Sequence, residues 1–75
     1  MPPQKNIKLY QDPRYGMRWV IRVDGVPLTA DAIRRLDGIS AFEPRNGYLL
    51  LFPCAGRDCE SICQDVEKAL GVFRS

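Results

Sequence analysis

Three cysteines in the last third of the chain are the side chains most able to hold a metal or to react. They are Cys54, Cys59 and Cys63. Three thiolates could ligate zinc or an iron–sulfur cluster if a fourth ligand came from elsewhere in the fold. However, the spacing lacks the two Cys-x-x-Cys units of a typical zinc site, and Cys63 falls on the apolar side of a predicted helix. A metal or redox site is therefore an alternative hypothesis, in which Cys59 could be reactive because it stands in the first helical turn.

The sequence contains no histidine, so it lacks the usual general base and the commonest metal ligand. Its carboxylates stand mostly where turns and helix starts are predicted, and there short acidic side chains usually bond the backbone. The sequence pattern places no nucleophile beside a general base. We therefore expect a protein without catalytic activity and without a cofactor.

A second candidate group combines arginines with aromatic side chains on predicted strands. Arg18 and Arg22 project from one face of a strand, beside Lys8 and Tyr10 of the neighbouring strand. A basic sheet surface with aromatic rings is typical of single-stranded nucleic-acid binding, because cations contact phosphates and rings stack on bases. The net charge of only +2 instead favours a solvated face or a face covered by a protein partner. The predicted binding residues are Tyr10, Arg18, Arg22, Tyr48, Leu50 and Phe52.

Residues 47–52 (GYLLLF) form the longest unbroken apolar run, with turn residues before it and Pro53 after it. Because polar residues do not recur in it at a period of 2 or 3.6, the run predicts a strand buried on both faces. Such a strand belongs in the middle of the only sheet. If helices cover one face, the other face exposes either Tyr48, Leu50 and Phe52 or Leu49 and Leu51, unless an extra loop or the N-terminal segment covers them. An exposed apolar patch of this kind is typical of a protein interface.

Periodicity and turn chemistry predict the other elements. Alternating apolar residues indicate strands, and residues 12–16 supply the turn of a hairpin. Thr29 and Asp58 are suited to begin the two helices, and Gly71 is suited to end the second. The predicted strands are residues 7–10, 17–23, 39–42 and 47–52, and the predicted helices are residues 30–36 and 59–70. The apolar stripe of the longer helix is Cys59, Ile62, Cys63, Val66, Ala69, Leu70 and Phe73.

These elements occur in the order β-β-α-β-β-α and predict an α+β fold, with a four-stranded, mostly antiparallel sheet and two helices on one face. Residues 7–75 form one small domain after a disordered tail at residues 1–6. The pattern acid–Pro–Arg–x–Gly–apolar occurs at residues 12–17 and again at residues 43–48. The fold could therefore be a tandem ββα repeat, although so short a match also arises by chance.

Residues 45–52 (RNGYLLLF) resemble the conserved octapeptide of the RNA-recognition motif, in which a basic residue and a glycine precede aromatic residues. The spacing is one residue off, and Leu50 stands where that motif has an aromatic ring. The order of elements from Trp19 onward also resembles ferredoxin-like domains, which include small copper chaperones. Their Met-x-Cys-x-x-Cys loop is absent, because the connector at residues 24–29 reads DGVPLT. The first resemblance implies RNA as a ligand, whereas copper transfer is disfavoured.

The chain of 75 residues has an ordinary globular composition, with 45% hydrophobic and 27% charged residues. No apolar run approaches the roughly 18 residues that cross a bilayer, and residues 1–6 lack the apolar segment of a signal peptide, so we expect a cytoplasmic protein with no membrane partner. We predict a small regulatory domain that binds a protein, either a second copy as a homodimer or a larger target, through its apolar sheet face or a strand edge. Single-stranded nucleic acid, in particular RNA, is the alternative ligand.

Overall fold

The elements of the computed structural model follow the predicted order β-β-α-β-β-α and confirm the α+β class. The structure describes residues 5–71, so Phe73 and most of the predicted tail lie outside the described residues. In chain order the elements are strand β1 (Asn6–Asp12), the short 3₁₀ helix η1 (Pro13–Tyr15), strand β2 (Arg18–Asp24), helix α1 (Ala30–Arg34), strands β3 (Ile39–Arg45) and β4 (Tyr48–Pro53), and helix α2 (Cys59–Leu70).

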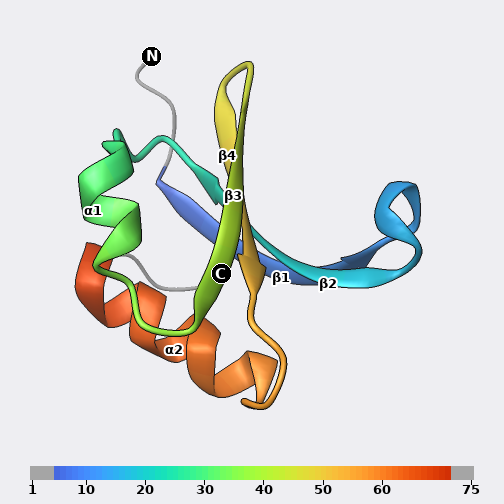
Figure 1. Ribbon diagram of the computed structural model, residues 1–75. Helices are drawn as coiled ribbons and strands as arrows, with labels where there is room; N and C mark the ends of the chain where they lie inside the picture. Colours follow the sequence, from blue (N-terminus) through green and yellow to red (C-terminus); the bar gives the residue numbers. More distant parts are fainter. Residues whose placement is uncertain (1–4, 72–75) are drawn as a thin grey trace.

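The four strands form one antiparallel sheet with the spatial order β1-β2-β4-β3. Each ββα half of the chain thus contributes one edge strand and one inner strand. β4 lies inside the sheet, as its apolar run predicts, and its Leu51 pairs with Ile21 of β2 and Phe42 of β3. Figure 1 shows that α1 and α2 lie on the same side of this sheet, which leaves the other face without an α-helix. That second face is called the helix-free face below.

The main core lies between the sheet and the two helices. Its buried members are Ile7, Ile21, Val23, Ile33, Leu51, Ile62, Cys63 and Val66. α2 begins at the predicted cap, where Asp58 Oδ1 accepts a hydrogen bond from the Glu60 amide at 3.4 Å, and it ends at the predicted Gly71. Since burying a large aliphatic side chain contributes about 1.5–3 kcal/mol, this cluster is the main source of stability.

The apolar stripe predicted for α2 is correct at its centre and wrong at Ala69. Ile62, Cys63 and Val66 are buried, whereas Ala69 is exposed. Glu67 is only 8% exposed although it is charged. The Cys63 thiol lies 3.7 Å from Glu67 Oε1, one helical turn away, and gives this carboxylate a polar neighbour. α2 therefore buries a wider face than steps of three and four residues predict.

Strand pairing extends beyond the predicted boundaries. Residues 43–45, predicted as part of a turn, are the end of β3, and Pro44 is tolerated there because β3 is an edge strand. β1 begins at Asn6, inside the predicted tail, and continues to Asp12. The two copies of the acid–Pro–Arg motif therefore differ in backbone structure: the first runs into η1, whereas the second belongs to strand β3.

Asp12 holds the turn between β1 and β2. Its Oδ1 accepts hydrogen bonds from the Arg14 amide at 2.9 Å and from Arg14 Nε at 3.3 Å, and its Oδ2 lies 3.1 Å from Arg14 Nη2. Asp12 is only 2% exposed. The hydrogen bonds from the Arg14 side chain lower the pKa of the Asp12 carboxyl below its ordinary value of 3.8. The ionised carboxylate therefore stabilises the folded state.

Replacing Asp12 by asparagine is expected to lower Tm at neutral pH, because the Arg14 guanidinium loses its charged partner. The folded-state pKa lies below the unfolded-state pKa, so the stabilisation is complete above about pH 4 and is lost as pH falls through the folded-state pKa. The difference in Tm between wild type and Asp12→Asn should therefore shrink below about pH 4. Thermal melts followed by circular dichroism across this pH range measure the difference.

Asp37→Asn is the control for this prediction. The Asp37 side chain is 93% exposed, and its ion pair with Arg57 is expected to contribute little to stability. If both variants lost the same Tm at neutral pH, the special contribution of Asp12 would be disproved.

Candidate functional site

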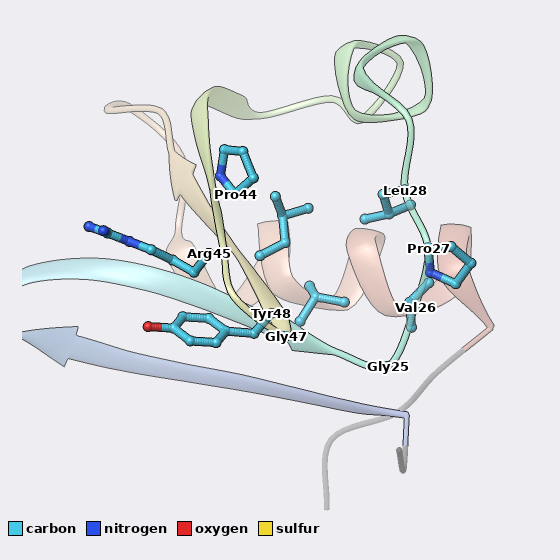
Figure 2. Close-up of a pocket in the computed structure, with 10 residues that line it drawn as sticks. Gly25, Val26, Pro27, Leu28, Pro44, Arg45, Gly47 and Tyr48 are labelled. Atoms are coloured by element: carbon cyan, nitrogen blue, oxygen red, sulfur yellow. The ribbon is translucent and has the colours of Figure 1, made fainter. Parts of the chain in front are cut away.

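A shallow groove of about 360 Å³ lies where the segment after β2 passes the turn between β3 and β4. Figure 2 shows Pro27 and Leu28 on one side of the groove and Pro44 on the other, while the side chains of Arg45 and Tyr48 extend away from them. Apolar side chains therefore form its centre. Among the described residues that line it, polar side chains do not converge as a catalytic site requires.

The helix-free face carries a second buried cluster formed by Val20, Leu50 and Phe52. Val20 and Leu50 are 0% exposed, and Phe52 is 6% exposed. The prediction that Leu50 and Phe52 form an exposed apolar patch is therefore wrong. The partly buried tyrosines packed against this cluster are Tyr10, Tyr15 and Tyr48. Side chains, and not a further layer of helices, close this face of the sheet.

Two arginines and one tyrosine cover the aromatic rings of the helix-free face. The guanidinium carbon of Arg18 lies 4.9 Å from the centre of the Phe52 ring, and that of Arg22 lies 4.0 Å from the centre of the Tyr48 ring. The Tyr15 ring meets Phe52 edge to face, with ring centres 5.2 Å apart. Attraction between the guanidinium charge and the ring electrons holds the two arginines over these rings. These contacts explain why apolar residues are buried where no helix covers them.

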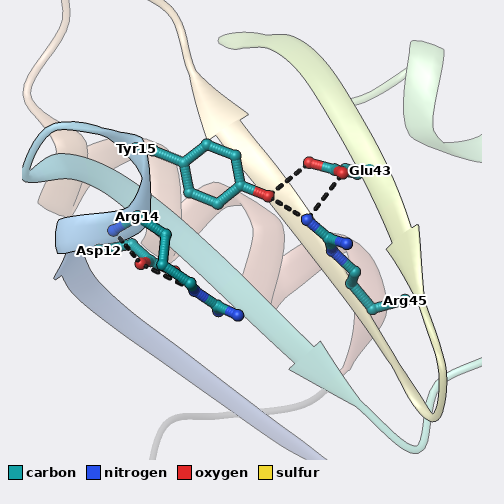
Figure 3. A network of polar contacts seen from close by, with 5 residues as sticks. All are labelled: Asp12, Arg14, Tyr15, Glu43 and Arg45. Atoms are coloured by element: carbon teal, nitrogen blue, oxygen red, sulfur yellow. Dashed lines mark hydrogen bonds and ion pairs between the residues drawn. The ribbon is translucent and has the colours of Figure 1, made fainter.

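A polar network fixes Tyr15 above the sheet. Tyr15 Oη donates a hydrogen bond to Glu43 Oε2 at 2.6 Å and accepts one from Arg45 Nη2. Arg45 Nη2 also lies 2.8 Å from Glu43 Oε1. Figure 3 shows the Tyr15 ring reaching from η1 toward Glu43 and Arg45 of β3. The hydrogen bond with Tyr15 raises the pKa of Arg45. The network thus connects the first turn of the chain to the far edge strand.

Cationic side chains outnumber carboxylates on the helix-free face and its turn. The cations are Lys8, Arg14, Arg18, Arg22 and Arg45, and the carboxylates are Asp12, Asp24 and Glu43. Each carboxylate pairs with an arginine, at nitrogen–oxygen distances of 3.1 Å for Asp12, 3.0 Å for Asp24 and 2.8 Å for Glu43. Arg18 instead donates to the Ser40 hydroxyl at 3.4 Å, and it forms no ion pair within the described chain. Among the arginines of this face, Arg18 is therefore the one most available to an external anion.

The other acidic residues lie on the helix side of the molecule. They are Asp31, Asp37, Asp58, Glu60, Asp65 and Glu67, which belong to α1, α2 or the segments next to them. The helix-free face is accordingly the more positive side of a chain whose net charge is only +2. Separated charges of this kind produce a field that draws anionic ligands toward the helix-free face.

The structure places the predicted binding residues on one face of the sheet. They are Tyr10, Arg18, Arg22, Tyr48, Leu50 and Phe52. Leu50 and Phe52 support this face from below and barely reach its surface. The binding prediction omitted Arg14, Tyr15, Glu43 and Arg45, which also belong to it. The repeated acid–Pro–Arg motif is a signal that could have found Arg14, Glu43 and Arg45, because in both copies the arginine pairs with the acid two residues before it.

The structure does not assemble the cysteines into a metal site. Cys63 is buried in the main core, and Cys54 and Cys59 are partly buried. Among residues 5–71, no group of three His, Cys, Asp or Glu side chains is arranged to hold a metal ion. Cys59 borders a hollow of about 320 Å³ together with Leu9 and Trp19. The reactivity of Cys59 stays a prediction.

Comparisons with protein-family models, with curated proteins and with solved structures found no match to this chain. In the part of the chain that the structure describes, no helix has the length and apolar character needed to cross a membrane. The function therefore has to be inferred from the side chains of the helix-free face.

Proposed function

We propose that this protein is a small non-catalytic domain that binds single-stranded nucleic acid on its helix-free face. The observation that carries the proposal is the layer of guanidinium groups on aromatic rings, with Arg18 on Phe52 and Arg22 on Tyr48. A guanidinium plane can stack on a base, and its N–H groups can donate hydrogen bonds to a phosphate. A single strand of nucleic acid, which has both flat bases and negative phosphates, offers a partner for stacking and a partner for these hydrogen bonds.

The composition of this face favours a single strand over a duplex. Bases of a single strand are free to stack on the arginines and tyrosines, whereas a duplex keeps its bases inside and presents phosphates. The ion pairs Arg22–Asp24 and Arg45–Glu43 reduce the net charge of the face. They thereby weaken binding that depends on phosphate attraction alone.

Replacing Arg18 and Arg22 together by glutamine is expected to weaken binding to short fluorescent oligomers of uridine and of deoxythymidine. Each lost phosphate contact reduces the slope of log K against log salt by about 0.7 for a single strand. The double variant should therefore bind more weakly than the wild type and with a shallower salt dependence. Fluorescence anisotropy over a range of salt concentrations measures both quantities, and a thermal melt of each protein checks the fold.

Arg34→Gln combined with Arg35→Gln is the matched control. It removes the same charge from exposed side chains at the end of α1, away from the helix-free face. This control is expected to keep the affinity and the salt dependence of the wild type. Equal losses of affinity in the two double variants would show that binding depends only on the net charge of the protein. Absence of wild-type binding at every salt concentration would reject the proposal, and an unlabelled duplex competitor separates single-strand binding from general polyanion binding.

A protein partner is the second candidate function, and the exposure of Trp19 and Met17 favours it. Trp19 is 43% exposed and Met17 is 53% exposed, near the start of β2. Tryptophan side chains often contribute a large part of the binding energy at protein interfaces. A dimer that forms with increasing concentration, carries no nucleic acid and is lost in Trp19→Ser would support this candidate over nucleic-acid binding.

A further inference from the structure

The turn at η1 is folded onto the helix-free face and is fastened there by Tyr15. The ring of Tyr15 packs on Phe52, and its hydroxyl bonds to Glu43 and Arg45. The turn is also closed on itself, because the Met17 amide donates a hydrogen bond to the Asp12 carbonyl oxygen at 3.0 Å. Tyr15 thus joins this turn to Phe52 of β4 and to Glu43 and Arg45 of β3.

The surface beneath the turn is apolar and almost fully covered. Phe52 is 6% exposed, and Val20 and Leu50 beside it are 0% exposed. The Tyr15 ring approaches Phe52 edge-on, with an angle of 68° between the ring planes. If Tyr15 moved away, the Phe52 ring would gain an open side next to the Arg18 guanidinium. An aromatic ring beside a cation is the pair of groups that a nucleotide uses for stacking and for phosphate binding.

The closed turn contains a strained residue. Met17 has φ of +61°, in the left-handed region that side-chain-bearing residues rarely adopt, and its side chain is 53% exposed. Packing of Met17 itself does not explain this conformation, because so much of its side chain faces solvent. The hydrogen bond from the Met17 amide to the Asp12 carbonyl oxygen and the contacts between Asp12 and Arg14 hold the turn in this conformation.

We propose that Tyr15 is a latch that holds η1 over the Val20–Leu50–Phe52 cluster, and that opening the latch presents Phe52 to a base of a bound strand. This inference rests on the proposed function and adds a regulated stacking surface to it. A phosphate near Arg45 would compete with Glu43 for the guanidinium that also donates to Tyr15. Strand binding therefore weakens the latch, and the latch in turn lowers the apparent affinity for the strand, because only the open form offers Phe52.

Tyr15→Phe tests the latch, because it removes the hydroxyl and keeps the ring and the charge of the face. Loss of the hydroxyl contacts is expected to increase apparent affinity for the uridine oligomer by about 2- to 10-fold, since a larger share of the protein is open. The salt dependence should stay as in the wild type, because no phosphate contact changes. Fluorescence of a neutral apolar dye such as Nile red should rise as the covered cluster becomes accessible.

Thr29→Ala is the control for a general loss of stability. Thr29 Oγ1 accepts a hydrogen bond from the Ala32 amide at 3.1 Å and caps α1, on the other side of the sheet from Tyr15. Its removal lowers stability without touching the turn. Thr29→Ala is therefore expected to leave both dye fluorescence and oligomer affinity at the wild-type level while its Tm falls.

The outcomes separate the latch from the proposed function. Increased dye fluorescence and increased affinity in Tyr15→Phe, but not in Thr29→Ala, support the proposal that Tyr15 is a latch covering a stacking surface. Unchanged dye fluorescence, or an affinity that stays equal or falls in Tyr15→Phe, overturns it. If neither wild type nor variant binds any strand while the dye signal still rises only in Tyr15→Phe, the nucleic-acid function and the stacking role fail and the covering role of Tyr15 is supported.

Discussion

Leu50→Asp is expected to leave most of the protein unfolded at room temperature. Leu50 is 0% exposed on an inner strand, and in the ladder it pairs with Arg22 on one side and Glu43 on the other. Loss of a buried leucine side chain costs about 2–5 kcal/mol, and burial of a carboxylate adds several more. Arg22 is already paired with Asp24, and Glu43 repels a second carboxylate. The free energy of unfolding of a chain of this length is about 4–11 kcal/mol, and the expected loss is of the same size.

Ala41→Asp is the matched control, and urea unfolding followed by circular dichroism measures both variants. Ala41 is exposed on β3 and pairs with Phe52, so the same carboxylate is introduced on a neighbouring strand without being buried. The control should stay folded, with a change in stability of about 0.5 kcal/mol or less. If Leu50→Asp instead unfolded at the wild-type urea concentration, Leu50 would lie at the surface. The exposed apolar patch predicted from the sequence would then be correct.

The parts of the fold that could be predicted are those that neighbouring residues determine. The apolar run at residues 47–52 has no polar position to face water, and the corresponding strand β4 lies inside the sheet. Asp58 marks the start of α2 through its side-chain cap, and Gly71 marks its end through its left-handed backbone conformation. Hairpins and helices alternate in the observed order because each turn and cap is encoded locally.

The burial of the helix-free face could not be predicted, because it depends on residues that are far apart in the sequence. Alternation along a strand assigns Leu50 and Phe52 to a face, but it does not say what covers that face. Tyr15 bonds to Glu43 across 28 positions of the chain, and no local pattern indicates such a contact. The same limit applies to Trp19, which alternates with buried Ile21 but is 43% exposed.

The sequence predicts several residues of the candidate site, but it does not predict which side chains form its outer layer. Alternation within β2 and β4 was enough to place Arg18, Arg22 and Tyr48 together. Arg45 was missed because residues 43–45 have good turn chemistry, whereas pairing with β4 makes them strand residues, with Arg45 opposite Tyr48. The result is a face whose outer layer consists of arginine side chains and tyrosine hydroxyl groups. This layer is the reason why we propose an anionic strand, and not an apolar protein surface, as the ligand.

Gly38→Ala is expected to destabilise the protein more than Gly47→Ala, although the two glycines have almost the same backbone conformation. Their φ angles are +87° and +88°, so alanine meets a similar left-handed strain of about 1–2 kcal/mol at either position. A Cβ atom on Gly38 would lie 3.0 Å from Ile62 Cγ1 and 3.2 Å from Arg57 Nη1, whereas one on Gly47 meets nothing within 4 Å. Overpacking should therefore add about 1–3 kcal/mol at Gly38 only.

Ile62 is the neighbour of Gly38 that has little room to move aside, because it is 0% exposed in the main core. Arg57 forms ion pairs with Asp37 at 3.2 Å and with Asp65 at 2.7 Å, but its guanidinium is the end of a flexible side chain and can shift. The Gly38 carbonyl oxygen accepts a hydrogen bond from the Cys54 amide at 2.7 Å, which fixes the start of β3 beside the end of β4. The added methyl group is therefore expected to crowd Ile62 in the core.

A double-mutant cycle with Ile62→Val identifies the cause of the difference. This substitution removes Ile62 Cδ1, which would lie 3.3 Å from the new Cβ, and it allows the remaining methyl group to relax. Alone it should cost about 0.5–1.5 kcal/mol. Combined with Gly38→Ala it should cost less than the sum of the two single changes, because the crowding is relieved. Urea midpoints at constant m-value measure all four proteins. Additive losses would mean that backbone strain alone disfavours alanine at position 38, and then Gly47→Ala should be equally destabilising.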